Sequence, residues 1–401
     1  MHIHKIVMLG NKDHGKSTLI GNMLMLTKSI SQERIDEAKR ISRALGIPFE
    51  PGFLLDSFSD EREKAMTIDT SRAQLVYKNS AFELIDVPGH EELITNMLTG
   101  ASSAGTAVLM VSAKHGEGIS KQTKRHLLIA MMLGMRNIVV AVNKMDSEGY
   151  KIESFGEVRN RLSAFISSAQ ESMGAVNAEF VPISAYNGDN LISKSENMEW
   201  YGGPTLMELI YRYATGTGKR GDIGLRAVVQ GEMQGNGLAC KVVSGRLFTG
   251  QRIAVNPGRL LCTVNRIIRA GRSVPQAGAG ASPVINLSPY SIMQRGGVIS
   301  EATDMPMVGR NFSAFIFLSR IPKNPSIKIN GAEAKCHIRI GRELDINTGR
   351  LKEGRAVSLG IYRASIKTLD ELAFEKFNTL TELGRFTIYD SAGFSGLGII
   401  I

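Results

Sequence analysis

The chain has 401 residues, of which 43% are hydrophobic and 21% are charged, a composition typical of a globular protein with two or three domains. No apolar run reaches the ~18 residues that a membrane-spanning helix needs, so we expect no membrane contact. Three scattered cysteines (Cys240, Cys262 and Cys336) lack metal-binding spacing, which argues against a disulfide scaffold and favours a cytoplasmic protein. The formal net charge of +10 suits an anionic partner such as RNA and equally suits plain solubility.

The first predicted elements are a strand over residues 5–9, a glycine-rich loop, and a helix that includes residues 19–26. The loop has the G-x-x-x-x-G-K-S spacing that cradles phosphates. We expect backbone N–H groups to hold phosphate oxygens, with Lys16 at the β and γ phosphates and the Ser17 hydroxyl on Mg²⁺. The predicted nucleotide contacts in this loop are Asn11, Lys12, Asp13, His14, Gly15, Lys16, Ser17 and Thr18.

A long excursion follows over about residues 27–66. A capping box beginning at Ser29 and apolar residues every three or four positions predict an amphipathic helix over residues 35–45. Thr67 closes the excursion, and its hydroxyl can coordinate Mg²⁺ when a γ-phosphate is present, which would make residues 50–70 a nucleotide-dependent switch. The alternatives are a helical hairpin without such a role and a threonine that simply begins the next strand.

Asp86 follows an apolar predicted strand and begins the sequence Asp-Val-Pro-Gly-His. A carboxylate at this position can hold Mg²⁺ through a water molecule, and Gly89 can place a backbone N–H beside the γ-phosphate. His90 can orient the attacking water, so we assign catalysis to Lys16, Gly89 and His90. The alternatives are an ordinary Asp-Pro-Gly turn and a surface histidine.

Guanine recognition is predicted at the ends of two later strands. The Asp146 carboxylate can accept both N–H donors of a guanine edge, a match that adenine cannot make. Asn143 can bond the base edge, and the Lys144 side chain can cover the ring. Ser184 and Ala185 offer a backbone N–H to the guanine O6. Either group alone is also consistent with a helix-cap turn, whereas both in this order indicate GTP rather than ATP.

Strand-like and helix-like segments alternate over residues 1–215, which predicts a mostly parallel sheet flanked by helices with ligands at the carboxyl ends of its strands. The predicted strands are 5–9, 73–77, 82–86, 107–111, 138–143 and 180–183, and the predicted helices include 120–133 and 158–171.

A glycine-rich linker over residues 214–221 precedes short β-rich runs separated by glycine and proline, the pattern of β-barrels. These runs are 225–230, 239–243, 252–255, 261–268 and 284–287, then 315–318, 326–329, 335–340, 356–361, 386–389 and 397–401. We therefore predict an α/β P-loop GTPase domain over residues 1–217, followed by two all-β barrel domains over residues 218–304 and 305–401.

The ordered motifs, together with residues 96–101 and 122–126, resemble the translational GTPases of the elongation factor Tu / 1-alpha class. The resemblance implies GTP/GDP and Mg²⁺ as cofactors, with aminoacyl-tRNA, the ribosome and a nucleotide-exchange factor as partners. The GTPase subunit of sulfate adenylyltransferase is the alternative, and its partner would be a separate adenylyltransferase catalytic subunit. Glu91 after the histidine favours this relative. A diverged GTPase with another protein partner is the third possibility.

The sequence departs from the elongation-factor pattern at three places. Ala65 stands where the family's switch has a glycine and restricts the backbone there. The second barrel lacks the histidine-bearing stretch of aminoacyl-tRNA carriers, and the aminoacyl-pocket region around residues 265–284 differs. The resemblance therefore implies GTP binding more strongly than tRNA delivery.

Overall fold

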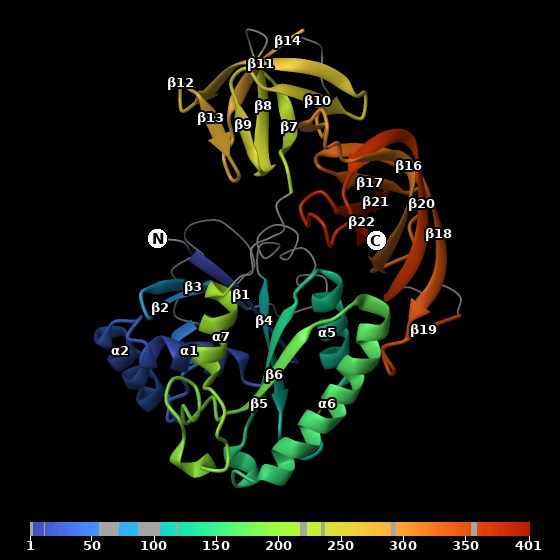
Figure 1. Cartoon of the computed structure of the whole chain (residues 1–401). Coiled ribbons are helices and arrows are strands. Elements are labelled where there is room, and N and C mark those ends of the chain that lie inside the picture. The colour runs from blue at the N-terminus through green and yellow to red at the C-terminus, as the bar shows by residue number, and fades with distance from the viewer. Residues whose placement is uncertain are drawn as a thin grey trace. The chain divides into compact units, whose positions relative to one another are not determined.

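The computed structural model describes residues 3–11, 13–55, 72–86, 105–117, 119–216, 223–233, 237–289, 294–353 and 359–401. The chain divides into two compact units (Figure 1). One unit contains Met1–Thr217 with Asp345–Arg350, and the other contains Gly218–Leu344 with Leu351–Ile401. In the described part of the chain, no helix is both long enough and apolar enough to cross a membrane.

The first unit is built on a sheet whose described strands follow the order β2-β3-β1-β4-β5-β6. The strands are β1 (Ile3–Gly10), β2 (Arg72–Tyr77), β3 (Ser80–Asp86), β4 (Thr106–Ser112), β5 (Asn137–Asn143) and β6 (Asn177–Pro182). Only β2 is antiparallel to its neighbour. Every residue of β4 is buried, as expected of a central parallel strand covered on both faces.

Helices cover both faces of this sheet (Figure 1). They are α1 (Lys16–Leu26), α2 (Gln32–Ala44), α5 (Lys121–Met132), α6 (Ile152–Met173) and α7 (Leu206–Thr215). The apolar sides of α1 and α7 share one core with alternate residues of the strands. The start of α7 is fixed by a capping box between Thr205 and Glu208, which satisfies two backbone donors that the helix leaves unpaired.

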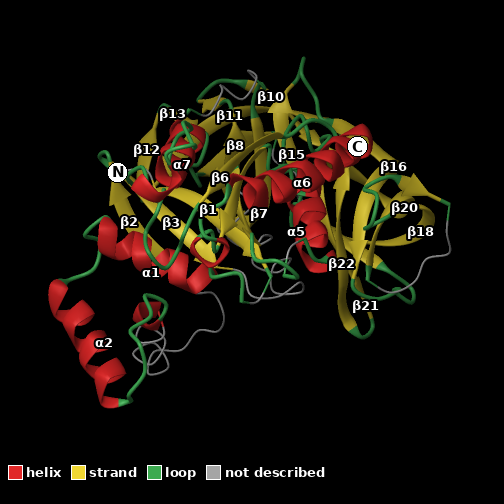
Figure 2. Cartoon of the chain, turned by 90° about the horizontal axis from the view of Figure 1, so that it is seen from below, coloured by secondary structure: helices red, strands yellow, loops and turns green. Residues whose placement is uncertain are grey.

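The helix of the predicted excursion is present as α2, but two expectations about it are wrong. Its N-cap is Ser31, whereas the Ser29 hydroxyl accepts a hydrogen bond from the Val76 N–H at 3.2 Å. The exposed fractions of Ile41 and Leu45 are 51% and 66%. The reason is that α2 stands apart from the sheet (Figure 2). Among the described residues, its buried side chains Ile35 and Ala38 pack in a small cluster with Leu54, beside the partly buried Met25, Ile30 and Phe49.

The first barrel closes from six antiparallel strands in the order β10-β15-β7-β8-β14-β11, with β11 pairing back to β10. These strands are β7 (Arg226–Met233), β8 (Gly237–Ser244), β10 (Arg252–Asn256), β11 (Leu260–Arg269), β14 (Val284–Ser288) and β15 (Val298–Glu301). The short strand β12 (Arg272–Val274) pairs antiparallel with the end of β11, and β9 (Arg246–Phe248) pairs with β13 (Gln276–Gly278).

The second barrel closes in the order β17-β21-β22-β16-β20-β18, with β18 pairing back to β17 and β19 (Leu351–Lys352) added to β18. Its strands are β16 (Met307–Leu318), β17 (Ser326–Ile329), β18 (Ala332–Leu344), β20 (Gly360–Phe374), β21 (Arg385–Asp390) and β22 (Gly393–Ile400). Residues 356–358 of the predicted strand 356–361 lie outside the described residues, and the predicted end at 361 is wrong because β20 continues to Phe374. The predicted fold class, an α/β domain with two β-barrels, is confirmed.

A buried arginine joins the two barrels within the second unit. Arg226 on β7 is 3% exposed, and its Nε donates to Glu375 Oε1 at 2.8 Å, just after β20. Its Nη1 donates to Asp304 Oδ2 at 3.0 Å. Asp304 is the last residue of the predicted first barrel domain. We propose that the boundary between the two barrel domains lies between residues 304 and 305.

Candidate nucleotide-binding site

The loop between β1 and α1 has a backbone that only glycine fits at two points. Gly10 and Gly15 have φ values of 145° and 87°. A Cβ at Gly10 would lie 2.8 Å from Met110 O, and a Cβ at Gly15 would lie 2.5 Å from Asn143 Nδ2. No side chain caps α1, which begins at Lys16, so its first N–H groups are available to an anion. The loop therefore forms the cradle that a phosphate group requires.

Lys16, the first residue of α1, directs its side chain back to the loop and is 8% exposed. Its Nζ donates to Gly10 O at 3.2 Å and to Asn11 O at 3.1 Å. Burial lowers the pKa of Lys16, whereas the charges of Asp86 and Asp13 raise it. The loop thus holds a cation at the place where the sequence predicts phosphate.

Asn143 connects the phosphate side of the site to the base side. It is 3% exposed, its Nδ2 donates to His14 O at 2.8 Å, and its Oδ1 accepts from Ala185 N at 2.8 Å. The sequence predicted that Asn143 and a backbone N–H of Ser184 or Ala185 would meet the base, whereas in this structure the Ala185 N–H donates to Asn143. Asn143 therefore fixes the position of one loop against the other.

Asn22 on α1 is a second connecting residue, which the sequence analysis missed. Its Nδ2 donates to Ala185 O at 2.8 Å and to Tyr186 O at 3.0 Å. Asparagine is unfavourable inside a helix, and Asn22 is 6% exposed among apolar neighbours. A lone amide inside an apolar helix was the available signal for it.

Asn143→Ala is expected to weaken GDP binding by about 10-fold or more, because each buried backbone group left unpaired costs about 1–3 kcal/mol. Equilibrium titration with a fluorescent GDP analogue measures this. Asn190→Ala is the matched control, since Asn190 is 1% exposed and bridges Pro182 O and Ser195 N, each at 2.9 Å. Equal losses of affinity in both variants would contradict the special role of Asn143.

The remaining loop side chains have different environments. His14 is 3% exposed and its Nδ1 lies 3.1 Å from Met110 O. Burial lowers the pKa of His14, which favours a neutral ring that anchors the loop to β4. Asp13 and Ser17 are exposed. The Thr18 hydroxyl donates to Glu50 Oε1 at 2.7 Å, a contact that the sequence did not predict.

On the base side, Lys144 is held by a carboxylate outside the predicted motifs. Its Nζ donates to Glu117 Oε2 at 2.7 Å, and the Ser112 hydroxyl donates to the same oxygen at 2.9 Å. The Lys144 hydrogen bond lowers the pKa of Glu117 to about 2. Asp146 follows at the start of a short 3-10 turn, Asp146–Glu148. Lys144 therefore has a fixed direction beside the residue predicted to read the base.

Acidification is expected to remove this contact. A carboxyl whose pKa is lower in the folded than in the unfolded chain stabilises the fold above its unfolded pKa, and that contribution disappears as the pH falls through the folded pKa. For Glu117 the window runs from the ordinary value of 4.5 down to about 2. Urea denaturation should give Glu117→Gln a lower free energy of unfolding than the parent at pH 7. The difference between the two free energies should shrink below pH 4.5.

The control for this prediction is Glu157→Gln, because Glu157 pairs with Arg161 and both side chains are 60% exposed. We expect little difference from the parent at any pH for that variant. If the loss in free energy of unfolding for Glu117→Gln stays constant from pH 7 to pH 3, the stabilising role of the Glu117–Lys144 ion pair is contradicted.

The predicted metal ligands are placed only in part. Ser17 lies in the first turn of α1, and Asp86 is the last residue of β3 and is 9% exposed. Because β3 and β1 are parallel, Asp86 and the phosphate loop lie at the same end of the sheet. A hydroxyl and a carboxylate are oxygen donors of the kind that Mg²⁺ takes. Lys12, Thr67, Gly89 and His90 lie outside the described residues.

The chain is similar to known proteins over its whole length. Residues 1–216 match the family described as "Elongation factor Tu GTP binding domain". Elongation factor 1-alpha of Saccharolobus solfataricus is 32% identical, over 100% of this chain and 97% of that protein. The protein of the same name from Aeropyrum pernix is 34% identical, over 98% of this chain and 95% of its own length.

A solved structure of similar fold is the S. cerevisiae Ski7 GTPase-like domain bound to GDP and inorganic phosphate. It covers 100% of this chain and 97% of its own chain, with a TM-score of 0.53 and 17% identity, so the likeness concerns the fold alone. The relatives confirm the predicted GTPase and the elongation-factor class, and they do not favour the sulfate adenylyltransferase alternative. The chain belongs to the family of translational GTPases that carry the elongation factor Tu GTP-binding domain.

Proposed function

We propose that the protein carries aminoacyl-tRNA in its GTP-bound state and releases it on the ribosome after hydrolysis. The observation that supports this most is the extent of the match: the similarity to elongation factor 1-alpha, at 32% identity, extends over 100% of this chain, so it includes both barrels. The formal net charge of +10 is consistent with an RNA partner. A cytoplasmic location and a nucleotide-exchange factor as a further partner belong to the same proposal.

The proposed roles of the site residues follow their positions. Lys16 and the N–H groups of the phosphate loop bind the phosphates, and Asp146 reads the guanine edge beside Lys144. Ser17, Thr67 and Asp86 would hold Mg²⁺, which neutralises phosphate charge when bound. Gly89 and His90 would sense the γ-phosphate and orient water. Phosphoryl transfer depends on positioning and charge stabilisation, so turnover should stay slow until a partner completes the site.

Filter binding of radiolabelled aminoacyl-tRNA tests the proposal directly. The full-length protein is loaded with a non-hydrolysable GTP analogue or with GDP and assayed at two salt concentrations. We expect tight binding only with the GTP analogue, and weaker binding at higher salt because phosphate contacts release counterions. Intact GTP hydrolysis without RNA binding in either nucleotide state would contradict the tRNA-carrier role. It would indicate that the GTPase acts on a protein partner instead.

A further inference from the structure

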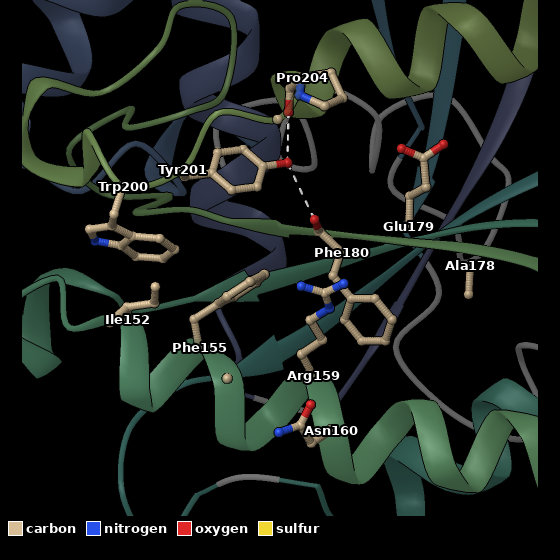
Figure 3. Close-up of a pocket in the computed structure, with 12 residues that line it drawn as sticks. Ile152, Phe155, Arg159, Asn160, Ala178, Glu179, Phe180, Trp200, Tyr201 and Pro204 are labelled. Atoms are coloured by element: carbon tan, nitrogen blue, oxygen red, sulfur yellow. Dashed lines mark hydrogen bonds between the residues drawn. The ribbon is translucent and has the colours of Figure 1, made fainter.

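The first unit contains a cavity of about 540 Å³ that includes none of the predicted nucleotide contacts. One side of α6 forms its floor, β6 forms one wall, and the segment 200–204 forms the other (Figure 3). Its lining includes Phe155, Gly156 and Arg159 of α6, Phe180 of β6, and Trp200 and Tyr201. Its volume falls in the range of ligand-binding pockets.

Aromatic rings line this cavity and are already fixed in place. The ring centroid of Phe155 lies 5.6 Å from that of Trp200 and 6.2 Å from that of Tyr201. The Trp200 Nε1 donates to Tyr150 O at 2.9 Å, and the Tyr201 hydroxyl lies 3.0 Å from Pro204 O. A guest side chain would therefore meet a preorganised apolar surface, which reduces the entropy lost on binding.

The wall formed by β6 is a sheet edge that is partly covered. The Tyr201 hydroxyl donates to Phe180 O at 3.3 Å, and Asn190 Nδ2 donates to Pro182 O at 2.9 Å. Among the described strands, β6 pairs only with β5. Asn177 N–H donates to Arg136 O and Ile183 N–H donates to Val142 O, at 2.7 and 2.8 Å. Because alternate residues of a strand direct their backbone groups to opposite edges, the N–H groups of Ala178 and Phe180 face away from β5. An extended peptide can pair with such an edge.

The cavity carries one uncompensated charge. The Arg159 guanidinium points from α6 into it, between Phe155 and Phe180 (Figure 3). No carboxylate of the described residues lies within 4.0 Å of Arg159. Glu179, the acidic residue of the lining, is bound instead by Arg212 at 3.2 Å and by the Tyr213 hydroxyl. A guest with a carboxylate would complement this charge.

We propose that the cavity binds an extended, acidic segment of a protein partner. The segment adds as a strand beside β6, places an aromatic side chain among Phe155, Trp200 and Tyr201, and pairs a carboxylate with Arg159. The three observations are independent of nucleotide binding, so the proposal stands apart from the tRNA-carrier role.

Trp200 is the single tryptophan of the chain, and its fluorescence therefore reports on the cavity directly. The probe is a capped hexapeptide of alternating valine and phenylalanine that ends in glutamate, titrated into the full-length protein. We expect a saturable change in emission, together with slower hydrogen exchange at the amides of Ala178 and Phe180. The same peptide with alternate amides N-methylated should bind at least about 10-fold more weakly, because it lacks donors for the strand edge.

Gly156→Leu tests the location of the site. A Cβ built at Gly156 meets nothing within 4 Å, so leucine can occupy the cavity without a clash and should reduce peptide affinity by about 10-fold or more. Glu157→Leu, one position along α6 at a residue that does not line the cavity, should bind like the parent. Arg159→Gln should weaken binding of the peptide that ends in glutamate by about 3- to 10-fold. It should weaken binding of the same peptide ending in glutamine by less.

An unchanged emission up to millimolar peptide would overturn the proposal. So would binding that Gly156→Leu leaves intact, because the peptide would then occupy another surface. Peptide binding that leaves hydrogen exchange at the Ala178 and Phe180 amides unchanged would contradict the pairing of the peptide with β6. None of these outcomes bears on the filter-binding result, so the two proposals fail independently.

Discussion

Asp146→Asn should exchange guanine for xanthine as the preferred base of the bound nucleotide. The carboxylate accepts two N–H donors from guanine, whereas an asparagine amide presents one acceptor and one donor, and the donor matches the extra carbonyl of xanthine. Hydrogen bonds to a charged group contribute about 1.5–3 kcal/mol each. We therefore expect GTP affinity to fall by about 100-fold or more, measured as competition of GTP and XTP against a fluorescent GDP analogue.

Asp189→Asn is the matched control for this result. Asp189 accepts hydrogen bonds from Tyr150 and Ser195, at 3.0 and 2.6 Å, so its replacement perturbs the neighbouring loop without touching the predicted base reader. That variant should keep its preference for guanine. A variant of Asp146 that also keeps the preference for guanine would remove the base-recognition assignment.

Arg226→Met should lower the free energy of unfolding by about 3–5 kcal/mol, because it leaves a buried carboxylate without its counter-ion. Glu375 is 6% exposed and Arg226 is 3% exposed, and the aliphatic replacement keeps the volume but not the charge. Urea denaturation of the full chain measures the loss. Faster hydrogen exchange in β7 and β20 would locate it at the contact between the barrels.

The control is an arginine pair of the same geometry at the surface. Arg342 Nε lies 3.0 Å from Glu353 Oε1, and these side chains are 58% and 87% exposed, so Arg342→Met should cost less than about 1 kcal/mol. The double variant Arg226→Met with Glu375→Leu should recover much of the lost stability, since both buried charges are then gone. Equal losses for the two single arginine variants would contradict the importance of burial.

The sequence predicted the placement of the site because its motifs follow strands. Gly10, Asp86 and Asn143 each end one of the parallel strands of the same sheet, and parallel strands bring their carboxyl ends to a common edge. The same spacing arguments located the phosphate loop and the base loop. Neither inference needed the positions of individual side chains.

Partners far apart in the sequence escaped prediction for a physical reason. Glu117 and Lys144 meet because β4 and β5 are neighbours, and Thr18 meets Glu50 through the return of the excursion. Such contacts depend on tertiary packing, which periodicity does not report. β20 was underestimated because its residues alternate between buried and exposed, so it lacks the continuous apolar run used to find strands.

The bonds of Asn143 and Asn22 have a consequence for biosynthesis. They join positions 14, 22, 143 and 185, so a growing chain cannot assemble the site until nearly the whole first unit has emerged from the ribosome that makes it. A ligand that binds only the finished fold stabilises it by about 2.7 kcal/mol at 100 times its dissociation constant. Binding of a cellular guanine nucleotide would thus complete the folding of the first unit. Nucleotide starvation would lower the amount of folded protein as well as the concentration of its substrate.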